Sequence, residues 1–221
     1  HAMSRRQRQM CIRDSSKFSV SSNGVLYRTD KVGCIPGILD LWFAQRVKYK
    51  NEMKKYGKSG NKEKYAFFHK RQLVQKILLN SLYGVLGLPA FRFYDIDNAE
   101  AVTTTGQTVI KSTADMANIK YNKELGDPEL DSNIYIDTDS VFFSAAPLLD
   151  KRIPSWRDNN QDTIAQYVND IAEEMQDYLN DFYDILSEKI FNVDKDKHRL
   201  EIKKEYVAKA CLLYTSPSPR D

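Results

Sequence analysis

Two aspartates, Asp137 and Asp139, stand one residue apart in the apolar segment NIYIDTDSVFF, residues 133–143. In a single strand, side chains two residues apart point to the same face. In a hairpin, DTDS would form the turn, because Asp and Ser are favoured turn residues. Either way the two carboxylates repel each other on an apolar base. A divalent cation such as Mg²⁺, which prefers oxygen ligands, would relieve that repulsion, although Asp-x-Asp by itself is also typical of a solvated turn.

A second set of polar residues follows helical spacing. Lys76, Asn80 and Tyr83 are four and three residues apart, so they line one face of a helix. Arg46 and Lys50 are four apart on an earlier helical segment. Several donors that converge can hold a triphosphate, and an aromatic ring beside them can stack on a base or sugar. The alternative is a solvated basic face, as on most helices rich in lysine.

Hydrophobic periodicity predicts the elements that must position these side chains. Two helices are expected over residues 36–56 and 62–82, and the polar turn 57–61 should make them antiparallel neighbours. The glycines and proline of 83–94 should end the second helix and lead into an extended segment. The apolar residues of the second helix that should face a core are Ile77, Leu78 and Leu82.

Two further helices are expected. Asp97 or Asn98 should cap the third, in which Gly106 indicates close packing. Its apolar stripe should consist of Ala99, Val102, Val109 and Met116. The last helix, over 162–190, should bury Ile164, Val168, Ile171, Met175, Leu179, Phe182 and Leu186. Residues 22–33 read as a short hairpin that turns at Asn23-Gly24, and 198–210 read as a strand.

The composition excludes several classes of protein. The chain has 221 residues, 42% of them hydrophobic, and a formal net charge of +3. That charge alone does not indicate a polyanionic partner. Three cysteines without paired spacing and three histidines argue against a disulfide scaffold or a zinc cluster, and no apolar run reaches the length of a membrane span. An intracellular protein that does not enter a membrane is expected.

Four segments in order carry a family resemblance. KILLNSLYGVLG (76–87) and YIDTDS (135–140) resemble motifs B and C of family B DNA polymerases. IPGILDLWFAQRVKYK (35–50) and FRFYDIDNAEAVTTTGQ (91–107) resemble the fingers and palm segments beside them, with most similarity to the tailed-phage branch. Four spaced motifs in order are far more specific than any one alone.

The resemblance implies an α+β fold, with an antiparallel palm sheet, packed helices and a protruding fingers arm of two antiparallel helices. It implies that Asp139, with Asp137 as a second ligand, binds two catalytic Mg²⁺ ions, and that Glu205 is an additional acidic residue near them. Arg46, Lys50 and Lys76 would bind the triphosphate of the incoming nucleotide, and Asn80 and Tyr83 would shape the pocket for the new base pair. The partners implied are primer–template DNA, a deoxynucleoside triphosphate and, in the full-length enzyme, a sliding clamp.

The resemblance also predicts a fragment. Asp14, Asp30 and Asp40 precede Arg46, and none begins the Asp-x-x-Ser-Leu-Tyr-Pro motif that supplies the other catalytic aspartate in this family. The chain alone should therefore be inactive. The ends, 1–16 and 211–221, look foreign and are typical of a metagenomic reading frame. Between them we expect a palm hairpin, 17–34, fingers, 35–84, and palm, 85–210. The similarity to the tailed-phage branch implies a virus-encoded protein.

Three alternatives stay open: a non-catalytic DNA-binding module, one half of a split polymerase, and a reverse transcriptase. The last is disfavoured because reverse transcriptases carry Tyr-x-Asp-Asp in place of Asp-Thr-Asp.

Overall fold

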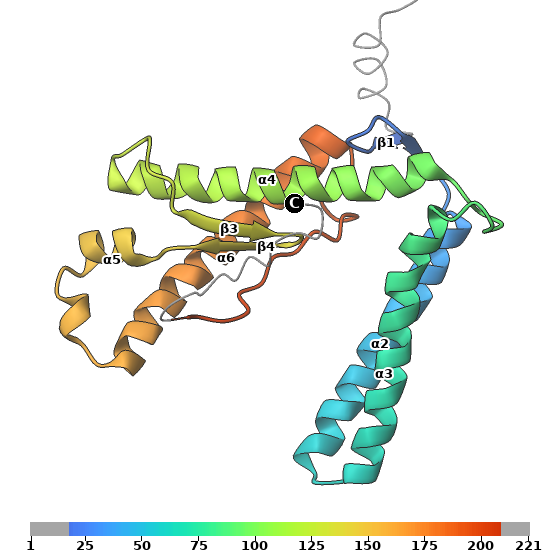
Figure 1. The fold of residues 1–221 in the computed structure, drawn as a ribbon, viewed down its shortest axis with the longest axis horizontal. Coiled ribbons are helices and arrows are strands. Elements are labelled where there is room, and N and C mark those ends of the chain that lie inside the picture. Colours follow the sequence, from blue (N-terminus) through green and yellow to red (C-terminus); the bar gives the residue numbers. More distant parts are fainter. Residues whose placement is uncertain (1–17, 209–221) are drawn as a thin grey trace, which may run out of the picture. The chain divides into compact units, whose positions relative to one another are not determined.

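The computed structural model describes residues 18–208, and these form five α-helices, one short 3₁₀ helix and two antiparallel two-stranded sheets (Figure 1). This is the α+β fold that the sequence predicts. The chain divides into two compact units. Within the described residues, the first holds 18–108 and 188–193, and the second holds 109–187 and 194–208. Helices α4 and α6 contribute to both.

The first unit begins with a hairpin that turns at the predicted Asn23-Gly24 but spans residues 18–28 in place of 22–33. Strand β1 (Phe18–Val20) pairs with β2 (Leu26–Arg28), and Gly24 takes the left-handed conformation, φ 89°, that the turn requires. The Asn23 amide donates to the backbone oxygen of Asp97 at 3.0 Å, and the Tyr27 hydroxyl donates to Asn98 at 2.7 Å. These two bonds fix the hairpin on the start of α4.

The rest of the first unit is an arm of two helices. Helices α2 (Cys34–Lys58) and α3 (Lys62–Leu86) run antiparallel and lie side by side (Figure 1). Asn61 caps α3 by accepting a hydrogen bond from the Lys64 amide at 3.0 Å. The prediction that Ile77 and Leu78 face a core is wrong, since their side chains are 56% and 37% exposed. Each helix has one neighbour in the arm, which cannot cover a wide apolar face.

The connection from α3 to α4 differs from the expectation. Helix α3 continues through Gly84 to Leu86, and residues 87–94 form turns in place of an extended segment. Helix α4 (Ile96–Leu125) is capped by Asp95, whose carboxylate accepts from the Asn98 amide at 3.1 Å. The cap therefore lies ahead of Asp97 and Asn98, because Asp95 precedes the first helical residue.

The second unit contains most of the core. Besides parts of α4 and α6 (Gln161–Phe191), it holds strands β3 (Asn133–Asp137) and β4 (Ser140–Phe143). It also holds α5 (Ala146–Arg152) and a 3₁₀ helix, Trp156–Asp158, which the sequence did not indicate. The central cluster consists of Ala117, Tyr121, Leu148, Leu149, Ile171, Met175 and Leu179.

The α6 part of this core confirms the predicted stripe, in which Ile171, Met175, Leu179 and Leu186 are buried and the other predicted positions are half-buried. The predicted α4 stripe is partly wrong. Val102 is 52% exposed, whereas Ala114, Ala117 and Tyr121 are buried. A methyl group added at Gly106 would meet nothing within 4 Å, so this glycine does not permit close packing among the described residues.

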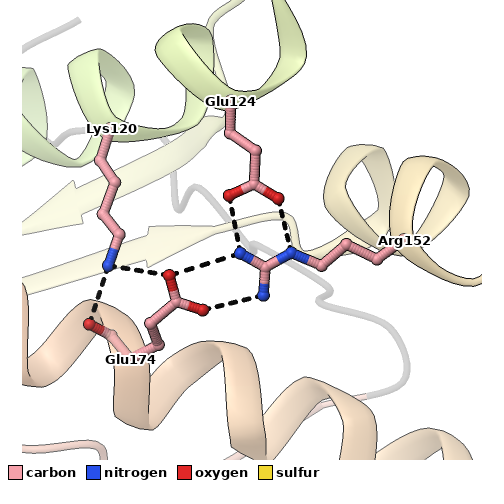
Figure 2. Close-up of polar contacts among 4 residues, drawn as sticks. All are labelled: Lys120, Glu124, Arg152 and Glu174. Carbon is pink, nitrogen blue, oxygen red and sulfur yellow. Dashed lines mark hydrogen bonds and ion pairs between the residues drawn. The ribbon is translucent and has the colours of Figure 1, made fainter.

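An ion-pair network joins three helices of the second unit (Figure 2). The Arg152 guanidinium of α5 donates to Glu124 of α4 at 2.5 and 2.6 Å and to Glu174 of α6 at 2.8 Å. The Lys120 Nζ atom lies 3.2 Å from the Glu174 Oε1 atom. These hydrogen bonds from Arg152 hold the pKa of Glu124 and of Glu174 below the ordinary value. The network thus fixes the short helix α5 on its two long neighbours.

The predicted strand at 198–210 is wrong over its described part, residues 198–208, which form no sheet. The Ile202 amide donates to the Asn180 side chain at 2.9 Å, and the Lys204 amide donates to Gln176 at 2.9 Å. Side chains of α6 thus satisfy the backbone groups that a neighbouring strand would otherwise pair. The predicted foreign ends lie outside the described residues. Between residues 18 and 208, no helix combines the length and apolar character needed to cross a membrane.

Candidate active site

The acidic turn joins β3 to β4. Asp137 pairs with Ser140, so Thr138 and Asp139 form a two-residue hairpin loop. The hairpin alternative is thereby confirmed and the single strand excluded. The Thr138 hydroxyl donates to the Asp137 carboxylate at 3.0 Å, and both aspartates are exposed. The turn therefore presents two carboxylates to solvent within three residues.

Thr138 holds an uncommon backbone conformation. Its φ is 49°, in the left-handed region that β-branched residues rarely occupy. Such a conformation costs about 1–3 kcal/mol and persists where the surrounding structure imposes it. Residues of this kind occur often at functional sites, which supports a functional interpretation of the turn.

The base of the hairpin is fixed to α4 by side-chain amides that the sequence analysis missed. Asn118 donates to Asp131 at 2.8 Å and accepts from the Ser132 amide at 3.0 Å. Asn133 donates to the backbone oxygen of Ala114 at 3.1 Å. The hydrogen bond from Asn118 lowers the pKa of Asp131. The only sequence signal for these contacts was the polar run GDPELDSN, residues 126–133, which by itself reads as an ordinary polar loop.

One edge of this hairpin is open. Within residues 18–208, β3 pairs only with β4. Besides Asp137, its exposed residues are large and apolar: Ile134, Tyr135 and Ile136. An isolated two-stranded hairpin is at best marginally stable in water, so a further strand on this edge would stabilise it.

The donor set fits a partial magnesium site. Mg²⁺ in nucleotide enzymes is held by one or two carboxylates together with water and substrate phosphates. Asp137 and Asp139 supply two exposed carboxylates, and neither forms an ion pair with a described residue. No group of three or more possible metal ligands occurs in the part of the chain that the structure describes. The turn can therefore contribute to a metal site that phosphates or other carboxylates complete.

Glu205, the additional acidic residue, is exposed on the segment that follows α6. Its neighbour Tyr206 lies beside the hairpin, with its ring centroid 6.1 Å from that of Phe142 in β4. The fold of the second unit thus brings this segment next to the acidic hairpin.

The polar residues of the arm that the sequence predicts to bind a nucleotide lie on one side of it. Gln75 of α3 donates to Gln45 of α2 at 2.9 Å, so these residues meet where the two helices touch. Each next residue is rotated by about 100° around its helix, and in an antiparallel pair the two rotations lead to the same side. Arg46 and Lys76 therefore project from the same side, at the same level of the arm.

Three more residues share that side because they follow at helical spacing: Lys50 on α2, and Asn80 and Tyr83 on α3. We call Arg46, Lys50, Lys76, Asn80 and Tyr83 the arm face. None of its three cations forms an ion pair with a described residue. The Arg46 Nε atom is buried without a hydrogen-bond partner in the described chain. The arm face thus carries positive charge that no described residue of its own unit neutralises.

Comparison with known proteins identifies relatives. The family model for DNA polymerase family B matches residues 2–213. The DNA-directed DNA polymerase of Escherichia phage RB69 is 27% identical, over 76% of this chain and 25% of that protein. That of Enterobacteria phage T4 is 36% identical over 50% of this chain and 12% of its own length. DNA polymerase 2 of Aeropyrum pernix is 32% identical over 59% of this chain and 15% of its own length. The chain spans at most a quarter of the length of these relatives.

Proposed function

The chain belongs to DNA polymerase family B, and from this premise we propose that it forms the fingers and part of the palm of a DNA-directed DNA polymerase. Residues 35–84 are the fingers in this proposal, and 17–34 and 85–210 belong to the palm. The substrates are primer–template DNA and deoxynucleoside triphosphates, as the names of its relatives, DNA-directed DNA polymerases, suggest.

The arm face is the observation that carries the proposal. Arg46, Lys50 and Lys76 bind the triphosphate of the incoming nucleotide, since three cations without ion pairs on one side of the arm can converge on it. Asn80 and Tyr83, one and two turns further along α3, contact the base pair that is being formed.

The acidic turn supplies the metal ligands. Asp139 and Asp137 hold magnesium through their carboxylates, and Glu205 adds negative charge beside them. When bound, two Mg²⁺ ions would activate the primer hydroxyl and neutralise the departing pyrophosphate. The hydrogen bonds at the hairpin base fix the backbone that carries both carboxylates, and the Thr138 hydroxyl donates to that of Asp137.

The proposed site is incomplete in this chain. The family motif with the other catalytic aspartate is absent from its sequence. The open edge of β3 suits a strand that carries that motif, because it offers unpaired backbone groups beside the acidic turn. The chain alone is therefore proposed to bind a nucleotide without extending a primer.

A nucleotide titration tests the arm face. Fluorescent mant-dATP should bind the purified chain in the presence of Mg²⁺, and Lys76→Ala should weaken binding by about tenfold, the loss expected from one charge-assisted hydrogen bond. Lys111→Ala, at an exposed lysine of α4, is the matched control and should leave binding unchanged. Equal binding by Lys76→Ala and the wild type would refute the proposed role. DNA binding that needs neither magnesium nor nucleotide would favour a non-catalytic module.

A further inference from the structure

The end of the arm carries an open slot. It lies where α2 turns into α3, has a volume of about 310 Å³, and is lined by Tyr56, Gly57, Gly60, Asn61, Lys62 and Tyr65. All of these belong to the first unit, and none belongs to the arm face. We call this region the arm tip.

The glycines explain why the slot is open. Gly57 lines the slot, and a Cβ atom added there would lie 3.4 Å from the Tyr65 ring. Gly60 has a φ of 72°, a conformation that glycine adopts without strain, and it lets the chain reverse before Asn61 caps α3. Two tyrosines therefore flank a gap that contains no side chain.

The arm tip is rich in lysine: Lys62 lines the slot, and the ammonium groups of Lys55 and Lys64 lie 5.8 and 5.0 Å from the centroid of the Tyr56 ring. Residues 53–68 contain five lysines and one glutamate. The lysines are Lys54, Lys55, Lys58, Lys62 and Lys64, and none of them forms an ion pair with a described residue. A surface patch with a net positive charge and an apolar centre attracts a partner of opposite charge and steers its approach.

Each tyrosine ring of the arm tip already stacks on a neighbouring aromatic ring. Tyr56 stacks on Phe68, with ring centroids 5.5 Å apart and planes 1° apart, and the Lys64 ammonium lies 5.0 Å from the Tyr56 centroid. Tyr65 stacks on His69 at 6.0 Å. Single-stranded nucleic acid binds proteins largely by stacking its bases on free aromatic faces. The rings here instead offer a gap that fits an apolar side chain.

We propose that the arm tip is a docking site for an acidic peptide segment of a partner protein. An apolar side chain of the segment enters the slot between Tyr56 and Tyr65, and its flanking carboxylates pair with the surrounding lysines. This interaction mode resembles other acidic motifs that basic clusters recognise. It uses no residue to which a polymerase role is assigned above, so either proposal can fail without the other.

Fluorescence anisotropy with a labelled peptide tests the docking site. The probe is Asp-Asp-Glu-Phe-Asp-Glu-Asp, and the comparison ligands are the same peptide with Ser in place of Phe and a labelled oligo-dT. The full chain should bind the Phe peptide at least about tenfold more tightly than the Ser peptide, because a buried phenylalanine contributes about 1.5–3 kcal/mol.

Variants assign the binding to the arm tip. The double change Lys55→Glu and Lys64→Glu should weaken peptide binding by at least about tenfold, whereas Lys111→Glu on α4 should change it by less than about twofold. Gly57→Leu fills the slot while raising helix propensity, so it should abolish the preference for the Phe peptide without loss of helical circular dichroism.

Several outcomes would overturn this inference: no peptide binding, an equal loss in Lys111→Glu, or an unchanged Phe preference in Gly57→Leu. Tighter binding of oligo-dT, weakened by the lysine reversals, would also overturn it and assign the arm tip to nucleic acid.

Discussion

At the scale of single residues, the pairing of a cation separates a structural role from a binding role. Arg152 is hydrogen-bonded to both Glu124 and Glu174, so carboxylates within the fold neutralise its charge. Arg46 and Lys76 have no ion pair among the described residues, and the charge on the arm face is free to meet an anion. Composition cannot make this distinction, because both kinds of cation count equally in the net charge.

Gly106 gives a prediction for a single residue. It is exposed inside α4, and a methyl group there would meet nothing within 4 Å. Gly106→Ala should therefore raise the free energy of unfolding by about 0.5–1 kcal/mol through helix propensity. Urea unfolding followed by circular dichroism measures the change.

Gly126→Ala is the matched control for this substitution. An added methyl group also meets nothing there, but the φ of Gly126 is 79°. This variant should be destabilised by about 1–2 kcal/mol, the cost of the left-handed conformation. A loss of stability in Gly106→Ala would show that the position is packed or strained after all.

At the scale of elements, the acidic hairpin depends on α4. Strands β3 and β4 form only a two-stranded sheet, which has little stability by itself. The edge-to-face contact of Tyr121 with Phe143, at 5.6 Å, and the amide bonds of Asn118 and Asn133 fix the hairpin on the helix. Burial raises the pKa of Tyr121, so this ring stays neutral in the core.

The ion-pair network gives a prediction at the same scale. Arg152→Ala removes the hydrogen bonds that join α5 to α4 and α6, and should lower the free energy of unfolding at neutral pH by about 1–2 kcal/mol, a modest value because the groups are partly exposed. Lys111→Ala, at an exposed residue without an ion pair among the described residues, should have almost no effect.

The pH dependence of this loss follows from the glutamates. The pKa values of Glu124 and Glu174 are lowered in the folded chain from the ordinary value of 4.5. Their contribution to stability is therefore present above about pH 4.5 and is lost as the pH falls through the lower folded values. The difference between wild type and Arg152→Ala should shrink in acid. A difference that stays constant down to full protonation would contradict the network's role.

At the scale of the whole molecule, the two units differ in how much they bury. No residue of α2 is buried, and Leu86 is the one buried residue of α3. The second unit buries Tyr121, Leu149 and Leu179 almost completely. Amide hydrogen exchange should therefore be much faster in the arm than in residues 171–187 of α6. Mass spectrometry of peptides from both regions measures the exchange. Equal protection of the amides in both regions would show that contacts other than those described here stabilise the arm.

Reconstitution of activity is the second prediction for the whole molecule. The purified chain should not extend a primer, because it lacks the first catalytic aspartate motif. An upstream polymerase segment with an Asp-x-x-Ser-Leu-Tyr-Pro motif, mixed with the chain, should restore synthesis, and Asp139→Asn should abolish it. Lys111→Ala serves as the control and should support synthesis like the wild type. Extension by the chain alone, abolished by Asp139→Asn, would contradict the prediction.

The sequence by itself determined the elements that local interactions form. The four long helices, the turn of the first hairpin and the buried stripe of α6 follow from periodicity and turn residues, and the structure confirms them. For residues 133–143 the sequence left a single strand and a hairpin open, and the structure decided for the hairpin. The ordered motifs also identified the family, which the family model confirms. Local patterns succeed here because a helix or a two-residue turn depends on residues close together in the chain.

Only the tertiary structure decided which faces are covered and which charges are paired. It exposed Ile77, Val102 and Gly106, and it bonded residues 198–208 to α6 in place of a strand. It also paired Arg152 with two carboxylates, whereas no described acidic residue pairs with the cations of the arm face. The physical reason is that burial and ion pairing depend on neighbours distant in sequence, which a periodic pattern does not contain.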